Sequence, residues 1–373
     1  MIYKYTFWVF NIITAIICLS ACSTDNTNND EFRLDYTRLQ DLDPEAISKK
    51  VFKDAQILEC SQEILDEVID NREVELLAKD GILVVKSLEK FEGSYLINLF
   101  DLESLTPKGK VAPFGPGPDE FTDTRIIKSN EDGTICYVLS LGKNKLFKLT
   151  SDLNLEYYTT IPTPINDDNF LMGFEALEMI SPDTILATQR KSDALGICTI
   201  SLRDSIATGI LAFDFTNDLN GYWPVYLGVT TYNQVHQKLV YGFNYYNQIV
   251  FSNISGNNMV IFRGDDYGGI KAKNKSEFWE SGNNVYYYSD LFSDDNYVYA
   301  LYRGAPYNPE FSDNDFYYIE VFSWLGEPIK RFKLPKGMQF SKGIITKEIG
   351  DTRIIYLINP TEDQFLYKVT IKI

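Results

Sequence analysis

The chain is poor in the residues on which many metal and nucleophilic sites depend. Its 373 residues include one histidine, His236, and five cysteines. No two cysteines have the C-x-x-C spacing of a zinc or redox site. A single imidazole and the lack of a G-x-S-x-G segment also argue against a Ser-His-Asp hydrolase. We therefore expect no catalytic residues of these classes and no metal bound by Cys and His.

Positive charge is scarce as well. Lysine and arginine together number 35, aspartate and glutamate number 52, and the formal net charge is −17. Such a chain repels phosphate backbones, and it has no basic stripe that would offset this repulsion. Nucleic acid is therefore excluded as an expected partner.

No apolar run near the N-terminus is long enough to span a bilayer. The run Phe7–Leu19 falls short of the about 20 residues that a spanning helix needs, so it indicates a signal peptide. Leu19, Ser20, Ala21 and Cys22 then resemble the bacterial lipoprotein box, whose cysteine is lipidated and becomes the new N-terminus. We predict a signal peptide over residues 1–21, then lipidated Cys22 and a flexible, polar tether to residue 50, with acyl chains that hold the protein to a membrane. The alternative is an ordinary cleaved signal in which Cys22 has no role.

A repeat organises the rest of the chain. Hairpins rich in Val, Ile, Tyr and Phe begin at residues 81, 134, 184, 236, 296 and 353, with a strand-like run before each and an outer run after most. The alternating pattern predicts antiparallel strands. Six four-stranded units predict an all-β, six-bladed β-propeller over residues 51–373. Because the last unit ends after its third strand, an N-terminal strand should close the ring, and Asp54–Cys60 is the candidate.

The segment GPGPDEF, residues 115–121, lies between an outer run and the next inner run. It lacks the lysine and the following helix of a phosphate-binding loop. Its glycines permit tight backbone turns and its prolines fix φ, so it predicts a junction between blades.

This junction carries a family resemblance. Residues 99–121 resemble the first-blade signature of the TolB-like six-bladed propeller lipoproteins, whose junction reads G-x-G-P-G-E-F. Asp119 stands where that family has glycine, and the matching residues are Gly115, Gly117, Pro118, Glu120 and Phe121. The resemblance extends more weakly over residues 50–373. It implies a propeller fold and a cell-envelope location, and it carries no catalytic residues.

The long loops predict a binding face. In a four-stranded antiparallel blade, the link between the second and third strands lies on the same face as the junction to the next blade. The long loops share that face, and they span residues 113–122, 161–174, 217–226, 263–284 and 303–315. Loops on a rigid ring are common recognition sites. The predicted ligand contacts on this face are Arg190, Tyr222, Trp223, Tyr245, Tyr246, Arg303 and Tyr307.

Aromatic rings offer stacking surfaces and arginines offer paired donors, which suits a carbohydrate or an acidic peptide. The alternative is that these aromatics pack beneath their own loops. We therefore predict a lipoprotein of the cell envelope, at the periplasmic or surface side of the outer membrane, whose propeller binds a protein, a peptide or a glycan.

The second hypothesis is an enzyme of the six-bladed lactonase or lyase type, with a calcium ion in the mouth of the channel. The oxygen-rich segments SDDN, residues 293–296, and RGDD, residues 263–266, are candidate ligands. Neither matches the EF-hand loop, and such clusters commonly form turns.

Overall fold

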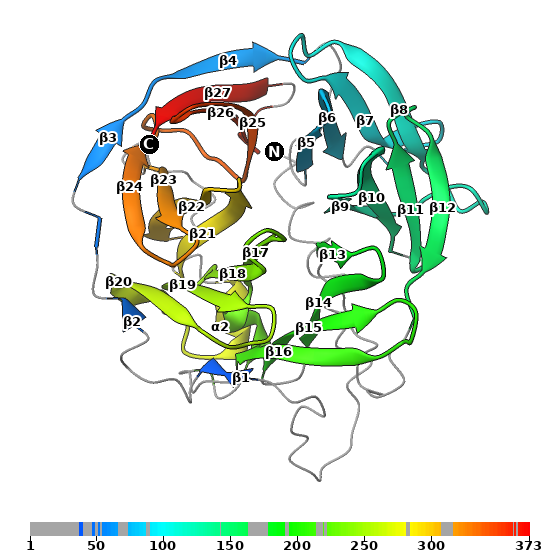
Figure 1. The fold of residues 1–373 in the computed structure, drawn as a ribbon. Coiled ribbons are helices and arrows are strands. Elements are labelled where there is room, and N and C mark those ends of the chain that lie inside the picture. Colours follow the sequence, from blue (N-terminus) through cyan, green and yellow to red (C-terminus); the bar gives the residue numbers. More distant parts are fainter. Residues whose placement is uncertain are drawn as a thin grey trace. The chain divides into compact units, whose positions relative to one another are not determined.

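The computed structural model describes residues 37–39, 47–48, 51–52, 54–65, 74–86, 90–141, 143–162, 178–190, 194–213, 219, 222–280, 284–306, 316–360, 362 and 365–373. The chain divides into two units, residues 1–33 and 34–373, and all of these residues belong to the second. This second unit is a ring of six blades, each with four antiparallel strands (Figure 1). The predicted six-bladed β-propeller is confirmed.

The blades follow one another along the chain, and their strands are as follows. Blade 1 consists of β5 (Glu75–Lys79), β6 (Ile82–Lys86), β7 (Tyr95–Asp101) and β8 (Pro107–Pro113). Blade 2 consists of β9 (Thr124–Lys128), β10 (Thr134–Ser140), β11 (Lys145–Thr150) and β12 (Leu155–Thr160). Blade 3 consists of β13 (Met179–Ser181), β14 (Thr184–Arg190), β15 (Leu195–Ser201) and β16 (Ala207–Phe213).

The second half of the ring has the same organisation. Blade 4 consists of β17 (Gly228–Asn233), β18 (Lys238–Phe243), β19 (Tyr246–Asn253) and β20 (Val260–Gly268). Blade 5 consists of β21 (Val285–Ser293), β22 (Tyr297–Pro306), β23 (Tyr318–Ser323) and β24 (Pro328–Lys333). Blade 6 consists of β25 (Lys342–Ile349), β26 (Thr352–Ile358), β27 (Phe365–Lys372) and β4 (Cys60–Ile64). The 3-10 helix η4 (Trp223–Tyr226) precedes blade 4, and the helix α2 (Lys275–Glu280) precedes blade 5.

The burial of the side chains along these segments depends on where each strand lies in its blade. The middle strands of a blade are buried on both faces, so β10 is buried at all seven positions, including Ile135 and Cys136. The outer strands face solvent, and β12 has three exposed positions among its six. The apolar residues gather in six clusters, one between each pair of neighbouring blades. The hydrophobic core is therefore divided into separate clusters between the blades rather than gathered in one central cluster.

The strand that closes the ring is not the one expected. The candidate Asp54–Cys60 ends where the closing strand begins, because β4 pairs antiparallel with β27 from Cys60↔Val369 to Ile64↔Phe365. Most of the candidate instead forms β3 (Ala55–Ile57), which lies parallel to β24 in blade 5. The closing strand therefore comes from the N-terminal side, as predicted. Its predicted position is wrong, because the strand begins at Cys60, where the candidate segment ends.

The segment before the closing strand also follows the outside of the ring. β1 (Thr37–Arg38) lies parallel to β16 of blade 3, and β2 (Ile47–Ser48) lies parallel to β20 of blade 4. Figure 1 shows β1, β2, β3 and β4 in succession around the perimeter. We call the described part of residues 37–65 the N-terminal belt. It adds a fifth strand to blades 3, 4 and 5 and supplies the fourth strand of blade 6.

Four apolar side chains fix the N-terminal belt in successive clefts between blades. Leu39 belongs to the cluster between blades 3 and 4, and Phe52 packs on the cluster between blades 4 and 5. Leu58 and Leu65 belong to the clusters between blades 5 and 6 and between blades 6 and 1. The Phe52 ring meets Phe322 edge-on, with the ring centres 5.2 Å apart. Each short strand of the belt is therefore followed by an apolar anchor.

The anchors predict at which positions a shorter side chain lowers the stability of the protein. Leu58→Ala should lower the free energy of unfolding by about 2–4 kcal/mol, because the side chain is only 6% exposed in a packed cleft. The neighbouring Ile57→Ala is the matched control, and it should cost less than about 0.5 kcal/mol because Ile57 is 76% exposed. Urea titration of both variants measures the difference. Equal losses at the two positions would contradict the anchor role.

Candidate functional site

The junction at residues 115–121 is held together by its own side chains. Oε2 of Glu120 accepts a hydrogen bond from the backbone amide of Gly117 at 2.7 Å. A Cβ at Gly115 would lie 2.1 Å from that same Oε2, so a larger residue there would displace the Glu120 carboxylate from this position. Lys143 donates its Nζ to the carbonyl oxygens of Gly117 and Glu120 at 2.5 and 2.8 Å. These groups are engaged with one another, and the geometry supports a structural junction rather than a ligand site.

Phe121 extends the junction into the core. Its side chain is buried, and its ring centre lies 5.0 Å from that of Phe147 in an edge-on contact. Its amide donates to the carbonyl oxygen of Pro113 at 2.8 Å. The segment thus fixes the direction in which the chain enters blade 2.

Three of the predicted contact residues meet around blade 4. Tyr222 and Trp223 lie at the start of η4, and Tyr245 lies in the turn between β18 and β19. The Phe278 ring of α2 stands between the two tyrosines, 5.6 Å from Tyr222 and 4.9 Å from Tyr245 between ring centres. Because η4, this turn and α2 are all second-to-third strand links or blade junctions, they share one face of the ring. We call this group the blade 4 aromatic cluster.

The other predicted contact residues are buried or have side chains outside the described part of the structure, and Tyr246 belongs to the buried core on which Tyr222 and Tyr245 pack. Tyr246 and Arg303 are 6% and 5% exposed, so their side chains lie inside the ring. The Arg303 guanidinium is 5.8 Å from the centre of the Tyr317 ring. Arg190 is the last residue of β14, and its side chain lies outside the described part of the structure. Tyr307 and Cys22 also lie outside the described residues.

Several members of the cluster were missed by the sequence analysis. Phe278 is buried at its centre, Tyr286 meets Tyr245 at 5.7 Å between ring centres, and Lys275 places Nζ 5.4 Å from the centre of the Tyr222 ring. A signal for α2 was present in the sequence. Oδ1 of Asn274 accepts from the amide of Glu277, and a capping residue three positions before a glutamate marks the start of a helix.

Among the described residues, three buried or half-buried carboxylates each link an inner strand to the neighbouring blade. Glu75 of blade 1 accepts from the amide of Ile126 in blade 2 at 2.6 Å. Asp290 of blade 5 accepts from the amide of Gly343 in blade 6 at 2.9 Å. Glu178, next to β13 in blade 3, accepts from the amide of Tyr232 in blade 4 at 2.9 Å. Each carboxylate therefore links an odd-numbered blade to the blade that follows it.

The pKa values of these carboxylates shift in different directions. Burial raises the pKa of Asp290, and the opposing charge of Lys342 only partly offsets it. Burial likewise raises the pKa of Glu178. Burial also opposes ionisation of Glu75, but Lys86, Arg125 and the amide of Ile126 together lower its pKa. Perturbed carboxyl groups often mark active sites, but here each one holds two strands together.

A further polar cluster lies between blades 4 and 5. Oε1 of Glu320 is 3.0 Å from Nε of Arg331, whose guanidinium lies 4.1 and 4.6 Å from the ring centres of Tyr318 and Tyr302. Burial raises the pKa of Glu320 to about 7, against the opposing effects of Arg331 and of the hydrogen bond from Tyr288. The carboxyl group therefore titrates near neutral pH.

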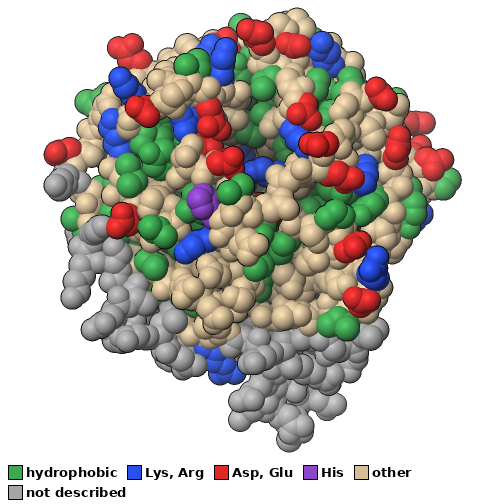
Figure 2. All heavy atoms as spheres, in the orientation of Figure 1, with side chains coloured by type: hydrophobic (Ala, Val, Ile, Leu, Met, Phe, Trp, Pro, Cys, Tyr) green, Lys and Arg blue, Asp and Glu red, His purple; other side chains and the backbone are tan. Residues whose placement is uncertain are grey.

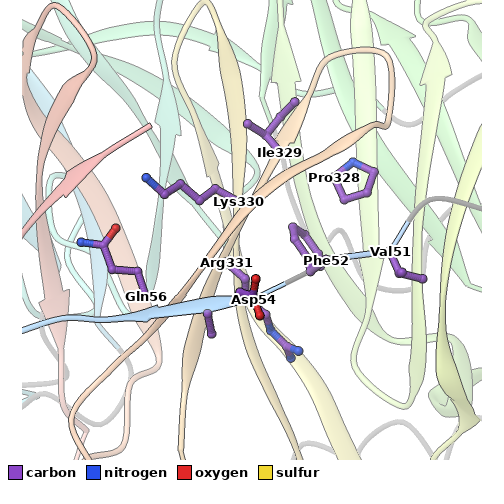
Figure 3. A pocket seen from close by; sticks show the side chains of 9 residues that line it. Val51, Phe52, Asp54, Gln56, Pro328, Ile329, Lys330 and Arg331 are labelled. Carbon is purple, nitrogen blue, oxygen red and sulfur yellow. The ribbon is translucent and has the colours of Figure 1, made fainter.

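A shallow pocket of about 560 Å³ opens beside this cluster at the perimeter of the ring (Figure 3). The N-terminal belt forms one wall and β24 the other, and the lining residues are Val51, Phe52, Asp54, Ala55, Gln56, Pro328, Ile329, Lys330 and Arg331. The guanidinium of Arg331 is engaged with Glu320 and with two tyrosine rings. The pocket is thus mainly the space where the belt crosses the outer strand.

The described residues contain no group of three or more His, Cys, Asp or Glu side chains arranged to hold a metal ion. The proposed oxygen ligands of SDDN are used locally instead. Oδ1 of Asp294 accepts from the amides of Asn296 and Tyr297, and Oδ2 accepts from Nε of Arg353. On the face drawn in Figure 2, acidic and basic side chains are interspersed over the part of the chain that is described.

The pKa of Glu320 predicts a pH dependence of stability. Because the pKa is raised in the folded state, the stabilisation that protonation provides is complete below about pH 4.5 and is lost as the pH rises through about 7. Glu320→Gln removes this titration, so from pH 5 to pH 8 its stability should rise relative to wild type by roughly 2 kcal/mol. Urea titration at both pH values measures the change, and parallel pH profiles of the two proteins would contradict it.

No family model and no curated protein matches the chain. Solved structures do resemble it. A member of the DUF4221 family from Bacteroides vulgatus ATCC 8482 has 14% identity and a TM-score of 0.59, and the match covers 87% of this chain and 99% of that one. A putative exported protein from Bacteroides fragilis NCTC 9343 has 12% identity and a TM-score of 0.52, with 86% and 98% covered. At these identities the likeness establishes a shared propeller fold.

Proposed function

We propose that the protein is a lipid-anchored lipoprotein of the cell envelope, at the outer membrane, and that its propeller is a binding module for a protein, a peptide or a glycan. The ring supplies a rigid support, since its six blades are packed against one another through buried clusters. Recognition then takes place on the loops above one end of the blades.

The blade 4 aromatic cluster is the observation that carries the binding proposal. It brings Tyr222 and Tyr245 from two separate loops to one place around Phe278, and Trp223 follows Tyr222 at the start of η4. All three are partly exposed, so their outer sides can stack on a sugar ring or a peptide side chain, and Tyr222 and Tyr245 also pack on the core. Lys275 adds a positive charge beside the Tyr222 ring, which favours an acidic ligand.

The envelope location rests on the N-terminal sequence. The N-terminus has the order of a lipoprotein signal: the apolar run Phe7–Leu19 ends in the box formed by Leu19, Ser20, Ala21 and Cys22. No helix among the described residues is long and apolar enough to cross a membrane. The similar Bacteroides fragilis structure is that of an exported protein, which agrees with this location.

Anchoring is tested by removing the lipidated thiol. Cys22→Ala should move the protein from the membrane fraction to the soluble fraction, because several acyl chains on one residue provide about 0.8 kcal/mol per buried methylene. Cell fractionation and incorporation of a labelled fatty acid measure the change, with Cys60→Ala as the matched control. The anchor proposal fails if the Cys22 variant stays in the membrane pellet or if the wild type takes up no label.

Binding is tested at the blade 4 aromatic cluster. Glycan and acidic-peptide arrays would first establish what the wild-type propeller binds. The double variant Tyr222→Ala and Trp223→Ala should then weaken that binding at least about ten-fold, because two stacking surfaces are lost. Phe91→Ala, which removes an exposed ring from the link between β6 and β7 of blade 1, is the matched control and should bind as the wild type does.

The same variants distinguish recognition from packing. If the rings contact ligand, the melting temperature of the double variant should stay within a few degrees of wild type. A large fall in melting temperature with no selective loss of binding would place these rings in the core, and the proposed face would be abandoned.

A further inference from the structure

The outer strands of the blades form two groups. The N-terminal belt pairs in parallel with the outer strands β16, β20 and β24 of blades 3, 4 and 5. Among the described strands, none pairs with the outer edge of β8 in blade 1, of β12 in blade 2 or of β4 in blade 6. An unpaired edge presents alternate N–H and C=O groups that can accept another strand.

On two bulged outer strands, the belt begins to pair one or two residues after the bulge. In β16 the extra residue of the bulge is Ile210, and β1 pairs with Leu211 and Ala212 directly after it. In β24 the extra residue is Ile329, and β3 pairs from Arg331 to Lys333. The bulge therefore does not prevent the addition of a parallel segment to an outer strand.

β12 has the same bulge and an unpaired edge. Its extra residue is Tyr158, because Leu146 pairs with Thr159 and Phe147 pairs with Tyr157. The equivalent docking position is therefore Thr159–Thr160. Ile161 donates its amide inward to Asn144 at 2.8 Å, so alternation places the amide of Thr160 on the outer edge.

β8 and β12 differ in how well their edges are protected. β8 has proline at both ends and two lysines, and these residues commonly block edge pairing. β12 reads LEYYTT, with no proline or lysine and with residues that favour strands. Tyr157 on this strand is 58% exposed. Of these two outer strands, β12 is the one that remains open to pairing.

We propose that β12 is a docking strand for an extended peptide segment of a partner protein. The segment lies parallel to β12, pairs at Thr159–Thr160, and places an apolar residue toward the cleft between blades 2 and 3. The belt shows the required pattern, since Thr37 and Arg38 are followed by Leu39, and Ala55–Ile57 is followed by Leu58. This site is separate from the blade 4 aromatic cluster, so either one can fail without the other.

The cleft beside β12 is where the apolar residue would pack. Its buried cluster consists of residues from blades 2 and 3, and Tyr158 and Leu202 pack on it while partly exposed. Leu39, Leu58 and Leu65 are part of the corresponding clusters between the blades that the belt crosses. A peptide that combines a short parallel ladder with one leucine therefore has both of the contacts that hold the belt in place.

Hydrogen exchange with a synthetic peptide tests this inference. The probe is DAQILE, the sequence of residues 54–59, added to the folded full-length protein. Exchange over residues 155–162 should slow at least about five-fold and in a saturable manner, because outward amides of β12 become bonded. DAQISE, in which serine replaces the anchoring leucine, should have at least about ten-fold weaker effect.

Two protein variants provide the matched control. Thr160→Pro removes an outward amide and should abolish the slowing, whereas Thr160→Val keeps the amide and should retain it. The inference is overturned if residues 155–162 are already protected in the free protein, since another segment then covers the edge. It is also overturned if the peptide leaves them unchanged, if DAQISE acts equally well, or if the slowing is confined to residues 331–333.

Discussion

The pairing of β4 with β27 is the interaction on which the ring depends. Blades 6 and 1 bury their facing sides only because this ladder completes blade 6 and brings Leu65 into the cleft between them. Without it, the buried faces that carry Leu83 and Leu366 would meet solvent. The N-terminal belt adds further contacts along the perimeter of the ring, since its four anchors enter four successive clefts between blades. Ring closure is therefore a property of about thirty residues rather than of one strand pair.

Inside the ring, polar contacts set how the blades are spaced. Glu75, Glu178 and Asp290 each accept a backbone amide from the next blade, so they fix the position of one inner strand against another. Buried carboxylates are costly unless they are paired or hydrogen-bonded, and removing one partner leaves an unsatisfied group. The same reasoning applies to Glu320, whose pKa of about 7 reflects a nearly dry position between two blades. These residues therefore belong to the framework that positions the loops.

The sequence predicted the blades because their signal is local and repeated. Strands such as β10 and β22 are long and rich in β-branched and aromatic residues. β1, β2 and β3 have two or three residues each, which is too few for a periodic pattern, and their partners lie far away in sequence. The burial of Tyr246 and Arg303 depends on how neighbouring blades pack. The resemblance of residues 99–121 to a family signature indicated the junction, but not that Glu120 would fill the space above Gly115.

The N-terminal origin of the closing strand has a consequence for biosynthesis. Gln62 and Tyr367, which face each other across the closing ladder, are 305 residues apart in the chain. The segment that leaves the ribosome early therefore cannot pair with β27 until the last blade has been made. Until this segment pairs, the outer strands that it covers have open edges, and such edges pair readily with other chains. Completion of the ring thus depends on contacts between residues far apart in sequence, which as a class form more slowly than local ones.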